Sequence, residues 1–247
     1  MGWVIDLDGV VWLGDRPIEG AAAAVARLRG EGEEVIFVTN NSFDRRASYE
    51  RRLADHGIPA GGAVVSSAMV AASIVTPDET VLVCGGPGIE EALSERGVTT
   101  VREGDADVVM VGFHRDFDYE RMRIASMAVN RGARLVATND DATYPTPAGA
   151  IPGGGAILAS IVTATGVEPL VAGKPHPAAV AFVVERLGPA GVVVGDRPST
   201  DGGFAVALGY RFALVLSGVT ARSDLPVEPA PDLVADDLGG AVSAVLD

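Results

Sequence analysis

"WVIDLDGVVW", residues 3–12, opens with a strand-like apolar run and then turns polar. Asp6 stands near the end of the run, Asp8 follows two residues later, and Gly9 permits a tight turn. Ligands of open α/β sheets bind just beyond the carboxyl ends of the strands. The stretch therefore predicts a first strand that carries two carboxylates to a ligand site. An ordinary aspartate–glycine turn would have the same sequence, so the choice between a turn and a ligand site depends on the rest of the chain.

Outward from this stretch, short apolar runs alternate with helical segments along the chain. An Ala-rich helical segment at about 20–30 separates the first run from "EVIFVTN" (34–40), which makes a βαβ unit. Alternation of this kind is typical of a parallel sheet covered by helices on both faces. We predict an α/β protein with a Rossmann-like, doubly wound parallel sheet.

The number of strand-like runs predicts a second, smaller domain. About ten such runs exceed what one sheet of this size usually holds. Residues 77–167 carry an α/β alternation of their own. We therefore predict a core made of residues 1–76 and 168–247, with an α/β cap inserted at 77–167.

The composition of the chain limits the classes of molecule that it can bind. The formal net charge of −14 leaves too few cations for a basic face, which argues against nucleic acid or an anionic membrane as a partner. It also means that a phosphorylated ligand needs local positive charge or a metal. The single cysteine, Cys84, fits a reducing compartment, and no apolar stretch approaches the roughly 20 residues that span a bilayer. We expect a cytoplasmic protein that acts on a small molecule.

Three further strand-like runs also end in polar residues, namely "VTNNS" (38–42), "PLVAGKP" (169–175) and "GVVVGDRPSTD" (191–201). The polar residues that they supply are Thr39, Asn40, Asn41, Lys174, Asp196 and Asp201. Each cluster alone could be a helix cap, a turn or a solvated loop. Lys174 is the only lysine of the chain. Four polar clusters at four strand ends favour one shared site over four separate accidents.

The residue types in these clusters suit phosphoryl transfer. Asp6 and Asp196 suit a hard divalent cation that prefers oxygen ligands, which is Mg²⁺. A carboxylate can attack phosphorus and form an aspartyl-phosphate, which splits one difficult step into two. Asp8 can protonate the leaving oxygen and later activate water. Thr39 and Lys174 can stabilise the phosphoryl oxygens.

The motifs "DLDGVVW", "VTNNS", "GKP" and "GDRPSTD", in this order, resemble the four motifs of haloacid-dehalogenase-superfamily phosphatases. The stretches "ATNDDATYP" (137–145) and "IPGGGAI" (151–157) are similar to the branch with a large α/β cap, type IIA, which includes nitrophenyl-phosphate-hydrolysing enzymes. The resemblance runs over nearly the whole chain. It implies Asp6 as nucleophile and metal ligand, and Asp8 as general acid and base whose backbone carbonyl also binds Mg²⁺.

The resemblance also assigns roles to the remaining residues. It implies that Asp196 binds Mg²⁺, that Asp201 supports the metal site, and that Thr39 and Lys174 bind phosphate. Asn40 and Asn41 are expected beside the phosphate. Residues expected at the substrate mouth are Asn139, Asp141, Tyr144 and His114, the last standing where relatives usually carry an aspartate. Arg197 could add positive potential or form a structural ion pair. A homodimer through the cap is a further expectation.

These observations predict a magnesium-dependent phosphomonoesterase that acts on small phosphorylated metabolites through an aspartyl-phosphate. A phosphotransferase or mutase using the same intermediate is the alternative, and product analysis separates the two. A binding module without catalysis is disfavoured, because every chemical residue is present. The sequence leaves the particular substrate open.

Overall fold

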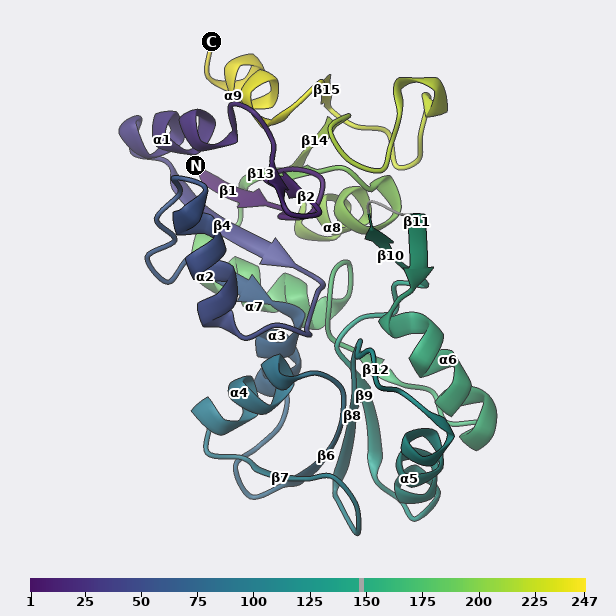
Figure 1. Ribbon diagram of the computed structural model, residues 1–247. Coiled ribbons are helices and arrows are strands. Elements are labelled where there is room, and N and C mark those ends of the chain that lie inside the picture. Colours follow the sequence, from purple (N-terminus) through teal and green to yellow (C-terminus); the bar gives the residue numbers. More distant parts are fainter. Residues whose placement is uncertain (147–148) are drawn as a thin grey trace.

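The computed structural model describes residues 1–146 and 149–247, which form two parallel sheets with helices around them (Figure 1). The larger sheet has six strands in the order β15-β14-β13-β1-β4-β5, and every neighbouring pair is parallel. Its strands are β1 (Gly2–Ile5), β4 (Glu34–Thr39), β5 (Val64–Ser66), β13 (Gly191–Gly195), β14 (Arg211–Val215) and β15 (Leu233–Ala235). The predicted doubly wound α/β fold is confirmed.

Helices cover both faces of the larger sheet. They are α1 (Ala21–Gly30), α2 (Arg46–Asp55), α3 (Ser67–Ser73), α7 (Pro177–Leu187), α8 (Gly203–Leu208) and α9 (Leu238–Leu246). Side chains alternate along a strand, so Trp3 and Ile5 of β1 pack in one apolar cluster with residues of α1, α2 and α9. Val4 points the other way, into a cluster with residues of α3, α7 and α8. Both faces of β1 are therefore buried, as its apolar run requires.

The smaller sheet has five strands in the order β12-β9-β8-β6-β7. They are β6 (Thr80–Cys84), β7 (Thr99–Val101), β8 (Val108–Val111), β9 (Arg134–Ala137) and β12 (Leu170–Val171). Helices α5 (Tyr119–Asn130) and α6 (Gly154–Thr165) pack on one face, and α4 (Pro87–Glu95) packs on the other beside α3. The described chain also contains two antiparallel strand pairs, β2 (Trp12–Leu13) with β3 (Arg16–Pro17) and β10 (Thr143–Thr146) with β11 (Gly149–Pro152).

Local sequence explains where several helices begin. The Asp118 side chain accepts the Arg121 backbone N–H at 2.8 Å and caps α5, and Asp237 does the same for α9 through Gly240. Pro177 opens α7, at a position where its missing N–H costs nothing. None of the described helices is long and apolar enough to cross a bilayer.

The run ending in Lys174 lies within the predicted core segment 168–247, and its strand, β12, pairs in parallel with β9 of the smaller sheet. The smaller sheet therefore extends to Val171, past the boundary predicted at 168, and its first strand begins at Thr80, near the boundary predicted at 77. A short apolar run shows that a strand forms, but not which sheet edge it joins.

Candidate active site

The larger sheet brings the predicted residues to one edge. Strand β1 lies between β13 and β4, so Asp6, Asp196 and Thr39 come from the carboxyl ends of three adjacent parallel strands. The Asp6 backbone N–H donates to Val194 of β13 at 2.9 Å, which continues the pairing one residue past the strand. Ligands bind at this edge in folds of this class.

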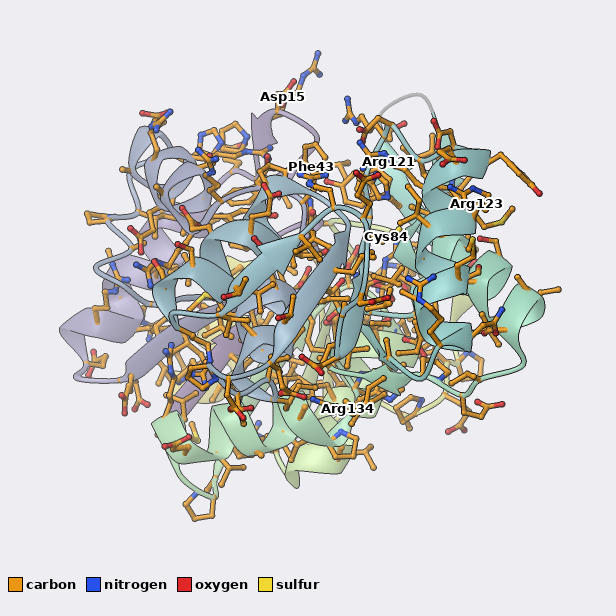
Figure 2. The ribbon with its side chains drawn as sticks, turned by 90° about the horizontal axis from the view of Figure 1, so that it is seen from below. Asp15, Phe43, Cys84, Arg121, Arg123 and Arg134 are labelled. Atoms are coloured by element: carbon orange, nitrogen blue, oxygen red, sulfur yellow. The ribbon has the colours of Figure 1, made fainter. Side chains whose placement is uncertain are left out.

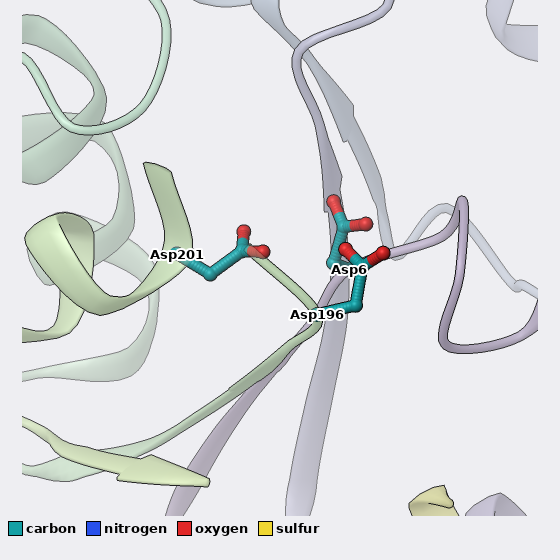
Figure 3. A group of neighbouring side chains, drawn as sticks. All are labelled: Asp6, Asp196 and Asp201. Carbon is teal, nitrogen blue, oxygen red and sulfur yellow. The ribbon is translucent and has the colours of Figure 1, made fainter. Parts of the chain in front are cut away.

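Three carboxylates meet there. One oxygen from each of Asp6, Asp196 and Asp201 lies within 4.8 Å of the others (Figure 3). Asp201 comes from the π-helical turn η1 (Pro198–Gly202), which follows β13. Lys174 completes the cluster, because its Nζ lies 2.6 Å from Asp6 Oδ1 and 2.6 Å from Asp201 Oδ1. Three carboxylates against one ammonium leave the cluster negative.

Asp196 is arranged like a metal ligand. Its Oδ2 accepts the Val219 backbone N–H at 2.6 Å, while its buried Oδ1 has no hydrogen-bond partner within the described part of the chain. Backbone approaches closely on both sides, because a Cβ would lie 2.2 Å from Oδ2 if added to Gly9 and 1.9 Å if added to Gly218. A buried carboxylate oxygen without a partner is costly, and a bound cation would satisfy it.

The electrostatics of the cluster also favour a cation. Burial raises the pKa of Asp196 to about 7, and the negative Asp201 adds to this shift. Burial likewise raises the pKa of Asp6, although Lys174 opposes it. Burial alone would lower the pKa of Lys174, but Asp201 and Asp6 outweigh burial and the net pKa is raised. The carboxylates resist ionisation in this site without further positive charge, which a hard oxygen-seeking metal would supply.

Asp8 lies beside the cluster, and together with Asp6, Asp201 and Lys174 it lines a cavity at this edge of the sheet. Its Oδ1 accepts the indole N–H of Trp12 at 3.0 Å. Burial raises the pKa of Asp8, and the bond from Trp12 opposes this shift. Gly9 next to it has φ of 92°, a left-handed conformation that glycine adopts without strain. A carboxyl with a raised pKa suits an acid that must hold a proton until it is needed.

Asn40 was expected beside the phosphate, but its side chain is hydrogen-bonded to the protein. Its Oδ1 accepts the Lys174 backbone N–H at 2.8 Å, and its Nδ2 donates to the Lys174 carbonyl and to Asp141 Oδ2, each at 3.0 Å. Both amide hydrogens are thus engaged, so the Asn40 side chain has no free donor for a phosphate. It instead fixes the backbone that carries Lys174. Thr39 lines the cavity, and its Oγ1 accepts the Asn41 backbone N–H at 3.1 Å.

Residues from the predicted cap close the other side of the cavity. The Asn41 side chain donates to the Tyr144 hydroxyl at 3.3 Å, and the Tyr144 ring stacks on Phe113 with centroids 5.5 Å apart. The cavity has a volume of about 60 Å³. Its lining includes predicted residues Asn139, Asp141, Tyr144 and Arg197 together with the unpredicted Phe113, Thr143, Gly153, Gly154 and Thr200.

His114 is not brought to this cavity. Its side chain is buried, with Nε2 3.8 Å from Cys84 Sγ and Nδ1 3.0 Å from Asp116 Oδ1. Cys84 and Asp116 line a separate cavity in the smaller sheet, together with Arg121 (Cys84 and Arg121 are labelled in Figure 2). The geometry gives no support to the predicted substrate contact of His114. Its neighbour Phe113 lines the active cavity instead, and no sequence pattern distinguished that phenylalanine from a core residue.

Comparison with known proteins agrees with this geometry. The family model described as haloacid dehalogenase-like hydrolase matches residues 3–99, and a second HAD-hydrolase-like model matches residues 171–241. An acid sugar phosphatase of Staphylococcus haemolyticus is 34% identical over 98% of this chain and 95% of its own length. A 5'-nucleotidase of Bacillus subtilis, YutF, is 34% identical over 91% of this chain and 90% of its own length.

A solved structure shows the same architecture. The glycerol phosphate phosphatase of Mycobacterium tuberculosis, in complex with magnesium, superposes with a TM-score of 0.88 at 35% identity. The match covers 97% of this chain and 75% of that one. The relatives align along nearly all of this chain, and the matched residues include the strand ends that carry the carboxylates. The chain belongs to the haloacid dehalogenase-like hydrolase family, and it is a phosphatase.

Proposed function

We propose that this protein is a magnesium-dependent phosphomonoesterase that cleaves small phosphorylated metabolites through an aspartyl-phosphate on Asp6. The observation that carries the proposal is the buried cluster of Asp6, Asp196 and Asp201 around Lys174, with Asp196 Oδ1 unpartnered among the described residues. One ammonium against three carboxylates leaves this arrangement short of positive charge, and a phosphate substrate would add more negative charge, so a bound cation is needed to balance both.

The metal would be held by Asp6, Asp196 and the backbone carbonyl of Asp8, with Asp201 in support. All are oxygen donors, which suits Mg²⁺. Magnesium supplies, when bound, positive charge that offsets the carboxylates and polarises the phosphoryl oxygens. The magnesium complex of the mycobacterial relative supports the same choice of ion.

The chemistry falls to three side chains of the chain itself. A carboxylate oxygen of Asp6 attacks phosphorus, and the bond between phosphorus and the ester oxygen breaks. Asp8 gives its proton to that leaving oxygen, so an alcohol departs. Water then attacks the phosphoryl group and gives a proton to Asp8, the bond from phosphorus to Asp6 breaks, and inorganic phosphate is released. Lys174 offsets charge on the phosphoryl oxygens throughout.

The cap would select the substrate. Phe113 and Tyr144 form an aromatic wall opposite the carboxylates, so the leaving group must fit between the two sheets. The relatives are named for a sugar phosphate, a nucleotide and glycerol phosphate, so this fold accepts different leaving groups. We assign this chain to small phosphate monoesters as a class.

The test uses 4-nitrophenyl phosphate. Turnover should require Mg²⁺ and stop in EDTA, and Asp6→Asn should lose about a thousandfold or more, because the nucleophile and a metal charge are removed together. Asp15→Asn is a matched control, since Asp15 is exposed and lies outside the cavity lining. Acid-quenched enzyme should carry phosphate that hydroxylamine releases. Substantial turnover by Asp6→Asn would exclude the covalent route.

A further inference from the structure

Trp12 is hydrogen-bonded to Asp8, the proposed general acid. It is fully buried at the start of the β2–β3 hairpin, and its indole N–H lies 3.0 Å from Asp8 Oδ1. The intervening loop folds back on itself, because the Gly9 N–H donates to the Trp12 carbonyl at 2.6 Å and the Trp12 N–H donates to the Leu7 carbonyl at 3.2 Å. The backbone thus fixes the distance between the indole and the carboxyl.

The indole ring is itself held in place. The guanidinium carbon of Arg52, from α2, lies 4.1 Å from the centroid of the Trp12 ring. Arg52 also donates to the Gly14 carbonyl, in the turn that joins β2 to β3. His56 contributes a second ring contact with Trp12, at 6.0 Å between centroids. A side chain restrained from α2 and from its own hairpin has little freedom to turn its N–H away from Asp8.

An indole N–H can only donate, so Asp8 Oδ1 is the acceptor in this bond. The carbonyl oxygen of a carboxylic acid is a stronger acceptor than its hydroxyl oxygen, so the bond favours a protonated Asp8 that carries its hydrogen on Oδ2. We propose that Trp12 is a positioning residue for the reaction: it holds Asp8 Oδ1 and so makes Oδ2 the oxygen that gives the proton to the leaving group. The same oxygen receives the proton of the attacking water. This inference rests on the proposed role of Asp8 as the acid.

Leaving groups of different acidity separate this role from mere packing. 4-Nitrophenolate departs readily without a proton, whereas an alkoxide needs one. The quantity to compare is kcat/KM for 4-nitrophenyl phosphate and for glycerol 3-phosphate, because it reports the step in which the leaving group departs. Trp12→Phe should lower kcat/KM for glycerol 3-phosphate about tenfold more than for 4-nitrophenyl phosphate, since general acid catalysis contributes about a hundredfold or more.

The chain offers a matched control in its other tryptophan. Trp3 is also fully buried, packs in the same apolar cluster, and donates through its indole N–H to Glu33 at 3.3 Å, away from Asp8. Trp3→Phe removes the same volume and the same kind of donor. The ratio of the two kcat/KM values should remain at the wild-type value in Trp3→Phe.

A second variant removes the donor and keeps the shape. The chain has two tryptophans, so in a Trp3→Phe background Trp12 is the only one left to replace. Benzothienylalanine, incorporated in a tryptophan auxotroph, replaces the N–H by sulfur at nearly constant volume. It should reproduce the selective loss on glycerol 3-phosphate, and it answers the question if Trp12→Phe fails to fold.

Asp8→Asn distinguishes failure of the inference from failure of the proposed mechanism. If Asp8→Asn lowers kcat/KM equally for both substrates, Asp8 is not the general acid, and the inference about Trp12 is then also wrong. If Asp8→Asn shows the selective loss but both Trp12 replacements keep the wild-type ratio, Asp8 is the acid and Trp12 only packs. If Asp8→Asn and both Trp12 replacements all lose activity selectively on glycerol 3-phosphate, the result supports both the acid role of Asp8 and the positioning role of Trp12.

Discussion

Lys174 shows how one side chain depends on its exact surroundings. Its side chain is 3% exposed, and its ammonium lies 2.6 Å from two carboxylate oxygens. An ammonium is a compact point charge, whereas a guanidinium is a planar fork that needs more room. The space around Nζ is occupied on two sides by Asp6 and Asp201. The chain uses arginine for all its other long cations, which is what a steric requirement specific to this position would produce.

We expect Lys174→Arg to fold and to lose at least about tenfold in kcat/KM on 4-nitrophenyl phosphate, because a shift of the phosphate by about 1 Å can cost a hundredfold. Lys174→Ala should lose more, since the charge also goes. Circular dichroism and thermal unfolding serve as folding controls. Kinetics near wild type for Lys174→Arg would mean that charge alone is required.

Cys84 should be unreactive while the protein is folded. It is 2% exposed, and burial raises the pKa of its thiol to about 12. Since the thiolate is the reactive form, very little of the folded protein is in the reactive form at pH 8. A disulfide reagent such as DTNB should label the folded protein slowly and the protein in guanidinium at once. The chain has one cysteine, so the signal is unambiguous, and rapid labelling of folded protein would contradict the buried position.

At the scale of elements, contacts between strand ends and loops hold together the edge of the larger sheet that carries the candidate active site. Asn40, just past β4, joins the loop that carries Lys174 to Asp141 of the hairpin region. Its carbonyl also accepts the Asn139 side chain at 2.7 Å and the Ser67 hydroxyl at 2.6 Å. One residue thus connects the end of a core strand to both segments that return from the smaller sheet. We interpret Asn40 as a residue that affects the reaction by holding the Lys174 backbone in place.

Asn40→Leu should therefore reduce kcat/KM on 4-nitrophenyl phosphate by about ten- to a hundredfold through loss of alignment. Inorganic phosphate should also inhibit this variant more weakly, because Lys174 is displaced. Stability should fall too, since leaving a buried polar group unsatisfied costs about 1–3 kcal/mol. Asn130→Leu, at an exposed helix end, is the control. Unchanged phosphate inhibition would show that Asn40 does not position Lys174.

The loop after β14 leaves room for Asp196, the proposed metal ligand. A Cβ at Gly218 would lie 1.9 Å from Asp196 Oδ2. Gly218→Ala should therefore displace the carboxylate and raise the Mg²⁺ concentration for half-maximal activity by about tenfold. Gly30→Ala is the matched control, because a Cβ there meets nothing within 4 Å. An unchanged magnesium midpoint in Gly218→Ala would argue against Asp196 as a ligand.

At the scale of the whole molecule, the two sheets share one continuous apolar cluster. Val4 and Val193 of the larger sheet belong to the same cluster as Val81 and Met110 of the smaller one, through α3 and α4. The cavity is lined by Asp6, Asp8 and Asp201, which follow strands of the larger sheet, and by Phe113, which follows β8 of the smaller sheet, and Tyr144 of β10. This division suits a core that does the chemistry and a cap that recognises the leaving group.

This division leads to a prediction about two residues of the predicted cap, Tyr144 and His114. Tyr144→Ala opens the aromatic wall and should change the ratio of kcat/KM between a sugar phosphate and 4-nitrophenyl phosphate by about tenfold, within the range that one pocket contact contributes. His114→Gln should leave that ratio unchanged, because His114 faces Cys84 and Asp116. Equal losses on both substrates in Tyr144→Ala would contradict selection by the cap.

Sequence alone was sufficient for the fold class, and it predicted that the carboxylates Asp6, Asp8, Asp196 and Asp201 lie at one edge of the sheet. The reason is local: a buried parallel strand reads as an apolar run, and its polar continuation marks the carboxyl edge. The structure brings Asp6 and Asp196, which follow two adjacent strands, and Asp201, from the turn η1, within 4.8 Å of one another.

Only the tertiary structure decided how the remaining residues are used. Lys174 reaches the site from a strand of the smaller sheet, Asn40 holds the Lys174 backbone, and His114 turns away from the cavity. Phe113, which reads like any core residue, forms part of the wall. These outcomes depend on which sheet edge a short strand joins and which face of a loop is covered. Both are settled by long-range packing, and local periodicity carries no record of either.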